Sequence, residues 1–161
     1  MRTAFLTAFI LNIGMNLLSL LILPETAAIH FGSGGRPDGW ASREFHALMM
    51  ILVDVLVFFP LYFASSLIDR VPPRLLSLPY KQYWLREENR TRAKQLLARF
   101  MDEFGLVLFG FLFGVTLLAV AANRSDPVQL NERLFLVLFA GFMVYTFGWT
   151  IRLVVRLRPP R

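Results

Sequence analysis

The stretch Phe45–Leu67, FHALMMILVDVLVFFPLYFASSL, decides the fold, because it is apolar over a membrane-spanning length and carries one formal charge, Asp54. A bilayer core about 30 Å thick is crossed by about 20 apolar residues in a helix. Three other stretches qualify in the same way: Ala4–Leu23, Phe104–Ala122 and Leu134–Val155. The sequence therefore predicts an all-α integral membrane protein, a four-transmembrane-helix bundle that forms a single membrane domain over residues 1–161.

The composition supports this prediction. Of 161 residues, 56% are hydrophobic and 17% are charged, whereas soluble domains carry about 25% charged residues. This balance excludes a disordered chain and argues against an ordinary soluble enzyme. The absence of Cys excludes disulfides and thiolate metal sites. We expect the first apolar segment to be kept as a helix, because it is longer than the core of a usual signal peptide.

The basic residues predict the orientation. Thirteen of the 17 Lys and Arg residues lie near the two termini or between the second and third segments, and four lie in the other two connections. Basic residues favour the cytoplasmic side. We therefore expect both termini and residues 68–103 to be cytoplasmic, and residues 24–44 and 123–133 to face outward. This pattern explains the net charge of +6 without a nucleic-acid partner.

The outward connection 24–44 is expected to be folded. Thr26–Phe31 suits an extended piece, and Pro37-Asp38-Gly39 is a strong turn signal. His30 and Asp38 are types of side chain that bind divalent metals, but two ligands are few. We therefore expect no metal and no cofactor, with Asp38 capping a turn and His30 bonded to the loop backbone.

The cytoplasmic segment 68–103 begins with an irregular, Pro-containing stretch and continues as a predicted amphipathic helix over Tyr80–Met101, which is either separate from the third apolar segment or continuous with it. Its apolar positions include Trp84, Leu85 and Phe100, and its other face is rich in Arg and Glu. Such a helix fits the headgroup plane of the lipid bilayer. Docking of a cytoplasmic partner is the alternative.

Asp54 is costly inside a bilayer, by about 2.5–3.5 kcal/mol on insertion scales. Asn12 and Asn16 lie one helical turn apart on the first segment, at a similar expected depth. We expect the three side chains to form an intramembrane polar cluster. We favour a structural role, in which the cluster forms a polar contact between the two helices. The alternative is a proton or ligand relay.

Gly110 and Gly114 form a small-xxx-small pattern on the third segment. Such a pattern allows close approach of helices. It predicts packing inside the bundle, against another membrane protein, or against a second copy in a homo-oligomer.

Residues 30–40 resemble a known signature, HFxxxGxPDxW. The matching residues are His30, Phe31, Gly35, Pro37, Asp38 and Trp40, preceded by Pro24. This signature marks a bacterial membrane domain of unknown function, DUF1648, which forms the N-terminal part of SdpI-like toxin-immunity proteins. A second stretch is similar to the pattern PNKxYWLxPExR of that group, although it has Tyr80 in place of the Asn and lacks the second Pro. Its matching residues are Tyr83, Trp84, Leu85, Glu88 and Arg90.

The resemblance implies a small multi-pass protein of the bacterial cytoplasmic (inner) membrane. In the SdpI group, the implied activity is protection against a secreted toxin and sequestration of a repressor at the membrane. We therefore expect a non-enzymatic binding module that acts in immunity, sensing or assembly. The alternative is a small transporter or channel subunit that uses Asp54 with Asn12 and Asn16.

Overall fold

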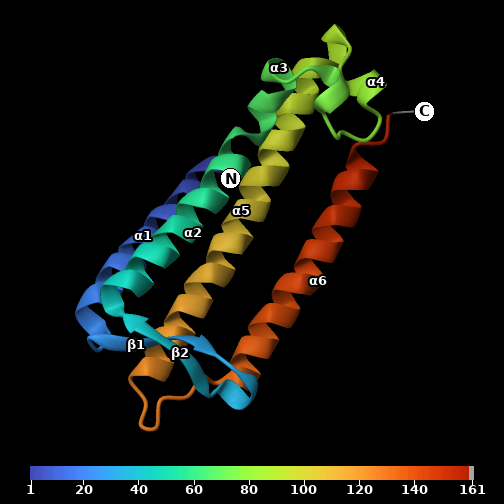
Figure 1. Ribbon diagram of the computed structural model, residues 1–161. Coiled ribbons are helices and arrows are strands. Elements are labelled where there is room, and N and C mark those ends of the chain that lie inside the picture. Colours follow the sequence, from blue (N-terminus) through green and yellow to red (C-terminus); the bar gives the residue numbers. More distant parts are fainter. Residues whose placement is uncertain (160–161) are drawn as a thin grey trace.

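The computed structural model describes residues 1–159, over which four long helices are joined by short elements and one two-stranded hairpin (Figure 1). The long helices are α1 (Arg2–Ile22), α2 (Arg43–Phe63), α5 (Glu87–Asn123) and α6 (Glu132–Arg156). The short elements are β1 (Thr26–Phe31), η1 (Ser33–Gly35), β2 (Pro37–Ser42), η2 (Ala64–Ser66), α3 (Leu67–Arg70), η3 (Pro73–Leu75) and α4 (Lys81–Trp84).

Each of the four long helices is apolar and long enough to cross a membrane, and α2 with its continuation reaches Arg70. They correspond to the four predicted segments. Large apolar side chains point outward from them: Leu21 is 82% exposed, Val137 71% and Val144 74%. Soluble monomers rarely expose contiguous apolar surface on this scale. The structure is therefore compatible with a multi-pass membrane protein.

The core of the molecule lies between α1, α2 and α5. The Phe5 ring of α1 is fully buried and stacks on Phe58 of α2, with 5.3 Å between ring centres. It also tilts against Phe109 of α5 at 5.8 Å. Gly105 permits this arrangement, because a Cβ at that position would overlap the Phe5 ring. Packed aromatic rings thus hold three of the four long helices together.

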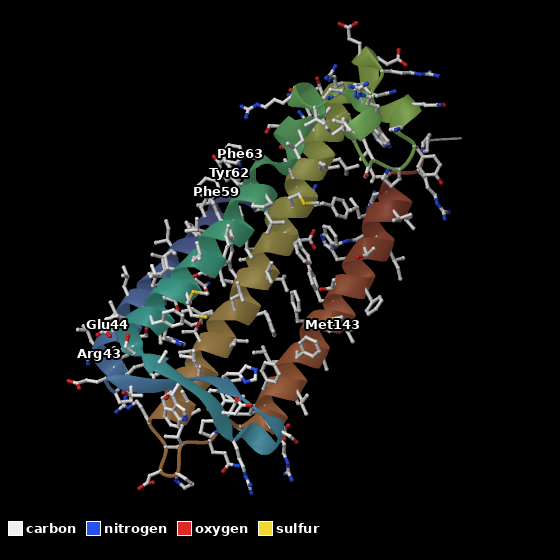
Figure 2. The ribbon with its side chains drawn as sticks, in the orientation of Figure 1. Arg43, Glu44, Phe59, Tyr62, Phe63 and Met143 are labelled. Atoms are coloured by element: carbon white, nitrogen blue, oxygen red, sulfur yellow. The ribbon has the colours of Figure 1, made fainter. Side chains whose placement is uncertain are left out.

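The fourth long helix, α6, packs on α5 and stands apart from α1 and α2 (Figure 1). Aromatic pairs span the interface: Phe111 lies 4.6 Å from Phe142 between ring centres, and Phe104 lies 4.7 Å from Trp149. Figure 2 shows side chains filling the space between the two ribbons. No residue of α6 is buried. The bundle is therefore a three-helix core with a fourth helix on its side.

We call the end of the bundle that carries the β-hairpin the hairpin end, and the opposite end, with α3 and α4, the terminal end (Figure 1). At the terminal end, Arg2 pairs with Asp102 at 2.7 Å. Its guanidinium also lies 3.6 Å from the ring centre of Tyr62, which Figure 2 labels beside Phe59 and Phe63. Arg2 therefore ties α1 to both α2 and α5.

The amphipathic helix predicted over Tyr80–Met101 forms from Glu87 onward, and of the two arrangements left open by the sequence, it is the one continuous with the third apolar segment. The chain forms the single turn α4, leaves helical geometry at Leu85 and Arg86, and enters α5, which continues without a break through the third apolar segment. At 1.5 Å per residue, the 37 residues of α5 span about 55 Å. This length exceeds a bilayer core of about 30 Å, so α5 also builds the terminal end.

The headgroup-plane interpretation required Trp84 to lie on an exposed apolar face, and the structure contradicts this. Trp84 is buried against Ile68, Ala93 and Leu157. Its indole Nε1 donates a hydrogen bond of 2.7 Å to the Leu157 carbonyl, just beyond α6. A buried indole N–H requires such a partner, and this one fastens α6 to the terminal end.

The hairpin occupies the loop predicted to be folded, and β1 coincides with the expected extended piece Thr26–Phe31. The strands are antiparallel, with a register irregularity beside His30. Gly34 and Gly35 follow with φ of 73° and 72°, a region that favours glycine. The Gly35 carbonyl accepts a 2.9 Å hydrogen bond from the backbone N–H of Leu130, which joins the hairpin to the α5–α6 connection.

These two glycines allow backbone strain to be separated from close packing. We expect Gly34→Ala to cost about 1–2 kcal/mol, because it places a Cβ at positive φ in open space. Gly35→Ala should cost clearly more, because its Cβ would also overlap the Leu130 backbone. Thermal unfolding of both variants in detergent measures the difference. Equal destabilisation would mean that the Gly35–Leu130 contact does not hold the hairpin.

Candidate functional site

The hairpin lies across the hairpin end, from α2 past α5 toward α6 (Figure 1), and Asn123 holds it there. Asn123 is the last residue of α5 and is buried. Its side chain accepts from the Ala28 N–H at 2.6 Å and donates to the Ala28 carbonyl at 3.0 Å. One amide side chain thus satisfies both backbone polar groups of a buried strand residue, which would otherwise be unpaired.

Behind the hairpin is a cavity of about 390 Å³, enclosed by β1, α2, α5 and α6. This volume falls in the range of small-molecule sites. Most of its walls are apolar, formed by Ala28, Ile29, Phe31, Met50, Val115, Leu118, Ala119, Leu130, Phe135 and Leu136. The cavity can therefore hold an apolar group of small-molecule size.

Two buried polar side chains line this cavity: His46 of α2, 6% exposed, and Thr116 of α5, 1% exposed. Among residues 1–159, neither His46 Nε2 nor Thr116 Oγ1 has a hydrogen-bond partner. Leaving such an atom unpaired costs about 1–3 kcal/mol. A ligand with polar atoms would recover this free energy, so the two side chains mark the cavity as a candidate binding site.

Sequence reasoning missed His46. It considered Asp54 as the polar residue of the second apolar segment, although His46 is an ionisable side chain within the same segment. Ionisable residues inside apolar spans are functional candidates by default, and this signal could have identified it. Sequence reasoning did not place Thr116 in a binding site either, because nothing in the sequence shows which face of α5 meets the hairpin.

His30 and Asp38 contact each other across the hairpin, with 2.5 Å between Nδ1 and Oδ1, and both side chains are largely exposed. The expectation that Asp38 caps a turn while His30 bonds the loop backbone is therefore wrong. The register brings the two side chains together, because His30 faces Gly39 and Asp38 precedes it. Over residues 1–159, no group of three or more His, Asp or Glu is placed to hold a metal ion.

The other residues of the HFxxxGxPDxW signature divide between two surfaces. His30, Phe31 and Gly35 line the cavity. Pro37 and Trp40 line a separate surface pocket with residues 126–129, and Trp40 is half exposed. Pro24 links α1 to β1. The signature therefore builds both the roof of the cavity and the outer surface of the hairpin.

The predicted intramembrane polar cluster forms only in part. Asn16 Nδ2 donates to Asp54 Oδ2 at 2.8 Å, and both side chains are fully buried between α1 and α2. Asn12 does not join them. Its Nδ2 donates to the carbonyls of Ala8 and Phe109, each at 2.9 Å. The α1 face that carries Asn12 turns toward α5, so this part of the prediction is wrong.

The second family-like stretch lies at the terminal end, opposite the cavity (Figure 1). There Trp84 bonds α6, and Arg90 pairs with Asp69 at 3.1 Å and donates to the Ile68 carbonyl at 2.6 Å. Lys94 also pairs with Asp69. The remaining residues of the stretch surround these anchors, with Tyr83 and Leu85 packed on the buried cluster and Glu88 exposed near Arg86. This stretch connects helices rather than lining the cavity.

The two glycines of the small-xxx-small pattern differ. Gly114 faces α6, where an added Cβ would come within 2.8 Å of Leu138 Cδ2. Gly110 has no atom within 4 Å of a Cβ position. Gly114 therefore serves packing inside the molecule, and contact with a second subunit through Gly110 stays a prediction.

The Asn16–Asp54 pair can be tested by a double-mutant cycle. We expect Asp54→Asn to be nearly neutral for stability, because an amide still accepts from Asn16. Asp54→Leu should cost about 1–2 kcal/mol, the size of interhelical polar contacts, and should cost less in an Asn16→Leu background, where no amide is left unpaired. Equal costs in both backgrounds, from thermal unfolding in detergent, would contradict the pairing.

Comparison with known proteins gives one match. A family model described as "Domain of unknown function (DUF1648)" matches residues 7–53. This range covers most of α1, the whole hairpin and the first half of α2. It therefore includes Asn16, His30 and His46. No protein of curated function and no solved structure matches the chain. Residues 7–53 are thus similar to DUF1648.

Proposed function

We propose that this protein is a non-enzymatic binding module of the bacterial cytoplasmic membrane, which takes a small ligand into the cavity behind the hairpin. One observation carries the proposal: the cavity of about 390 Å³ contains two buried polar atoms, His46 Nε2 and Thr116 Oγ1, that have no partner in the part of the chain that the structure describes. Ligand sites combine apolar walls with a few polar groups in this way.

The polar groups support binding rather than catalysis. A hydroxyl becomes a nucleophile when an adjacent base accepts its proton. Within residues 1–159, Thr116 Oγ1 has no hydrogen-bond partner, so its proton is accepted neither by His46 of the same cavity nor by His30, which contacts Asp38. The arrangement supplies hydrogen bonds to a ligand without a base positioned at the hydroxyl.

Within binding, we propose a role in immunity or sensing, with SdpI-like proteins as the wider group. The match of residues 7–53 to DUF1648 and the HFxxxGxPDxW signature support this assignment. The hairpin would face the cell exterior, where a secreted toxin arrives. The terminal end, with its basic residues, would face the cytoplasm.

A second candidate is a small transporter or channel subunit. The fully buried Asn16–Asp54 pair favours it, since Asp54 Oδ1 and Asn16 Oδ1 both lack partners within the described residues 1–159. Relay through Asp54 would require that Asp54→Asn abolish flux in reconstituted vesicles while stability is kept. Unchanged flux would leave the pair with a structural role.

The proposed orientation predicts labelling of the hairpin from outside. Ser33→Cys, in η1 of the hairpin, should react with an impermeant thiol reagent in intact cells, because the chain has no other Cys. Ser77→Cys, near the terminal end, should react only after the cells are opened. The reverse pattern would overturn the orientation.

Filling the cavity should remove the ligand. Ala119 lines the cavity, so we expect Ala119→Phe to occupy the space of the ligand. Ala121 lies on the same helix but is exposed, so Ala121→Phe is the matched control. Native mass spectrometry of protein purified from its own membrane should show a bound mass in the wild type and in Ala121→Phe, and none in Ala119→Phe.

The same pair of variants tests the biological role. Cells that carry Ala119→Phe should lose protection against the toxin, and cells that carry Ala121→Phe should keep it. Identical bound mass in all three proteins would contradict ligand binding in the cavity.

A further inference from the structure

The chemistry of the cavity walls narrows the class of ligand. We infer that the cavity binds an uncharged, single-chain amphiphile whose hydroxyl group bonds His46 Nε2 and Thr116 Oγ1 while its alkyl chain lies among the apolar walls. The inference rests on the proposed function, since it names the ligand of that same site. It depends on the charges, the hydrogen-bonding atoms and the surroundings of the cavity.

The charges on the walls disfavour an ionic ligand. Neither Lys nor Arg lines the cavity, and the lining residue with a full charge is Glu132, which is exposed. Glu132 Oε1 already accepts from the Gly34 N–H at 3.3 Å. A phosphate or carboxylate would meet no cation here. An ammonium group beside His46 and Thr116 would be a buried charge without a countercharge, which is costly.

The two unpaired atoms favour a hydroxyl as the polar group. Thr116 Oγ1 can donate and accept, and neutral His46 Nε2 donates in one tautomer and accepts in the other. A ligand hydroxyl also donates and accepts, so it can bond both atoms with either tautomer. A ligand carbonyl only accepts, so it would satisfy His46 in one tautomer alone.

The surroundings make this hydrogen bonding decisive. An alkyl chain that moves from bilayer hydrocarbon into an apolar cavity gains little, because lipid tails are as apolar as Leu. The chain of the ligand therefore gives weak selectivity. Pairing of His46 and Thr116, two atoms that are otherwise buried and unsatisfied, supplies the difference between an alcohol and a hydrocarbon of equal length.

Because the sequence contains only two His residues, ligand binding at His46 can be measured directly from the signal of its side chain. The full chain, with ¹³C-labelled His, is placed in lipid nanodiscs, and the His30→Gln variant assigns the two signals. The probes are 1-octanol, octanoate and n-octane, compared at equal concentration in the membrane. We expect 1-octanol to shift the His46 signal saturably and to bind at least about tenfold more tightly than either other probe.

A conservative variant tests the second contact. Thr116→Val keeps the shape of the side chain and removes the hydroxyl, so it should weaken 1-octanol binding about three- to tenfold. The matched control is Thr146→Val in α6, whose hydroxyl bonds the Phe142 carbonyl within its own helix. Its affinity for 1-octanol should equal that of the wild type.

One more probe, 1-monooleoylglycerol, tests whether the ligand comes from the bilayer or is a smaller amphiphile. This probe carries hydroxyls on a lipid-sized chain. A shift of the His46 signal by this probe assigns the alcohol to the bilayer. A shift by 1-octanol alone assigns it to a smaller, freely exchanging amphiphile. Both outcomes support the hydroxyl assignment.

Other outcomes separate the two proposals. Equal binding of n-octane and 1-octanol, or no effect of Thr116→Val, would overturn the assignment to hydroxyl amphiphiles and leave binding in the cavity intact. Tighter binding of octanoate than of 1-octanol would also overturn the assignment to hydroxyl amphiphiles and leave binding in the cavity intact. If no probe shifts His46 and the bound mass is unaffected by Ala119→Phe, both the ligand class and the proposed function are wrong.

Discussion

The arrangement of the hairpin end depends on one side chain, Asn123, which bonds both backbone groups of Ala28. β1 and β2 bond each other, but a two-stranded hairpin alone is marginally stable. Asn123 fixes it to the C-terminal end of α5, and the Gly35–Leu130 hydrogen bond fixes it to the connection before α6. Without this placement, the cavity would lose the wall that β1 provides.

Buried polar groups in this molecule fall into two kinds. Asn12, Asn16 and Asn123 each donate to a partner on another element, and these contacts join elements of the fold. Within residues 1–159, Asn12 Oδ1, Asn16 Oδ1, His46 Nε2 and Thr116 Oγ1 are all unpaired, but only His46 and Thr116 among these four residues line the cavity behind the hairpin. Because a ligand in the cavity can pair these two atoms and recover the cost of leaving them unpaired, the second kind is the better indication of a binding site.

The fourth long helix is held mainly along one side and at its ends. At the hairpin end, Gln129 donates to the Gly34 carbonyl at 2.9 Å, just before α6 begins. At the terminal end, Trp84 bonds Leu157. Between them, aromatic rings and the Glu103–Arg152 pair connect α6 to α5. α6 thereby forms a wall of the cavity without entering the three-helix core.

The sequence alone determined the number and positions of the long helices, because apolar runs of that length have no other stable arrangement in water or lipid. It also indicated the folded loop through its Gly and Pro residues, and it predicted a polar cluster of Asn12, Asn16 and Asp54, of which the structure joins Asn16 and Asp54. Only the tertiary structure decided the rotation of each helix about its axis. That rotation turns Asn12 toward Phe109, buries Trp84, and places His46 and Thr116 around one cavity. Each of these helices carries apolar residues on all of its faces. Hydrophobic periodicity therefore gives little information about which face of a helix meets which neighbouring helix. Side-chain packing between distant segments makes that choice.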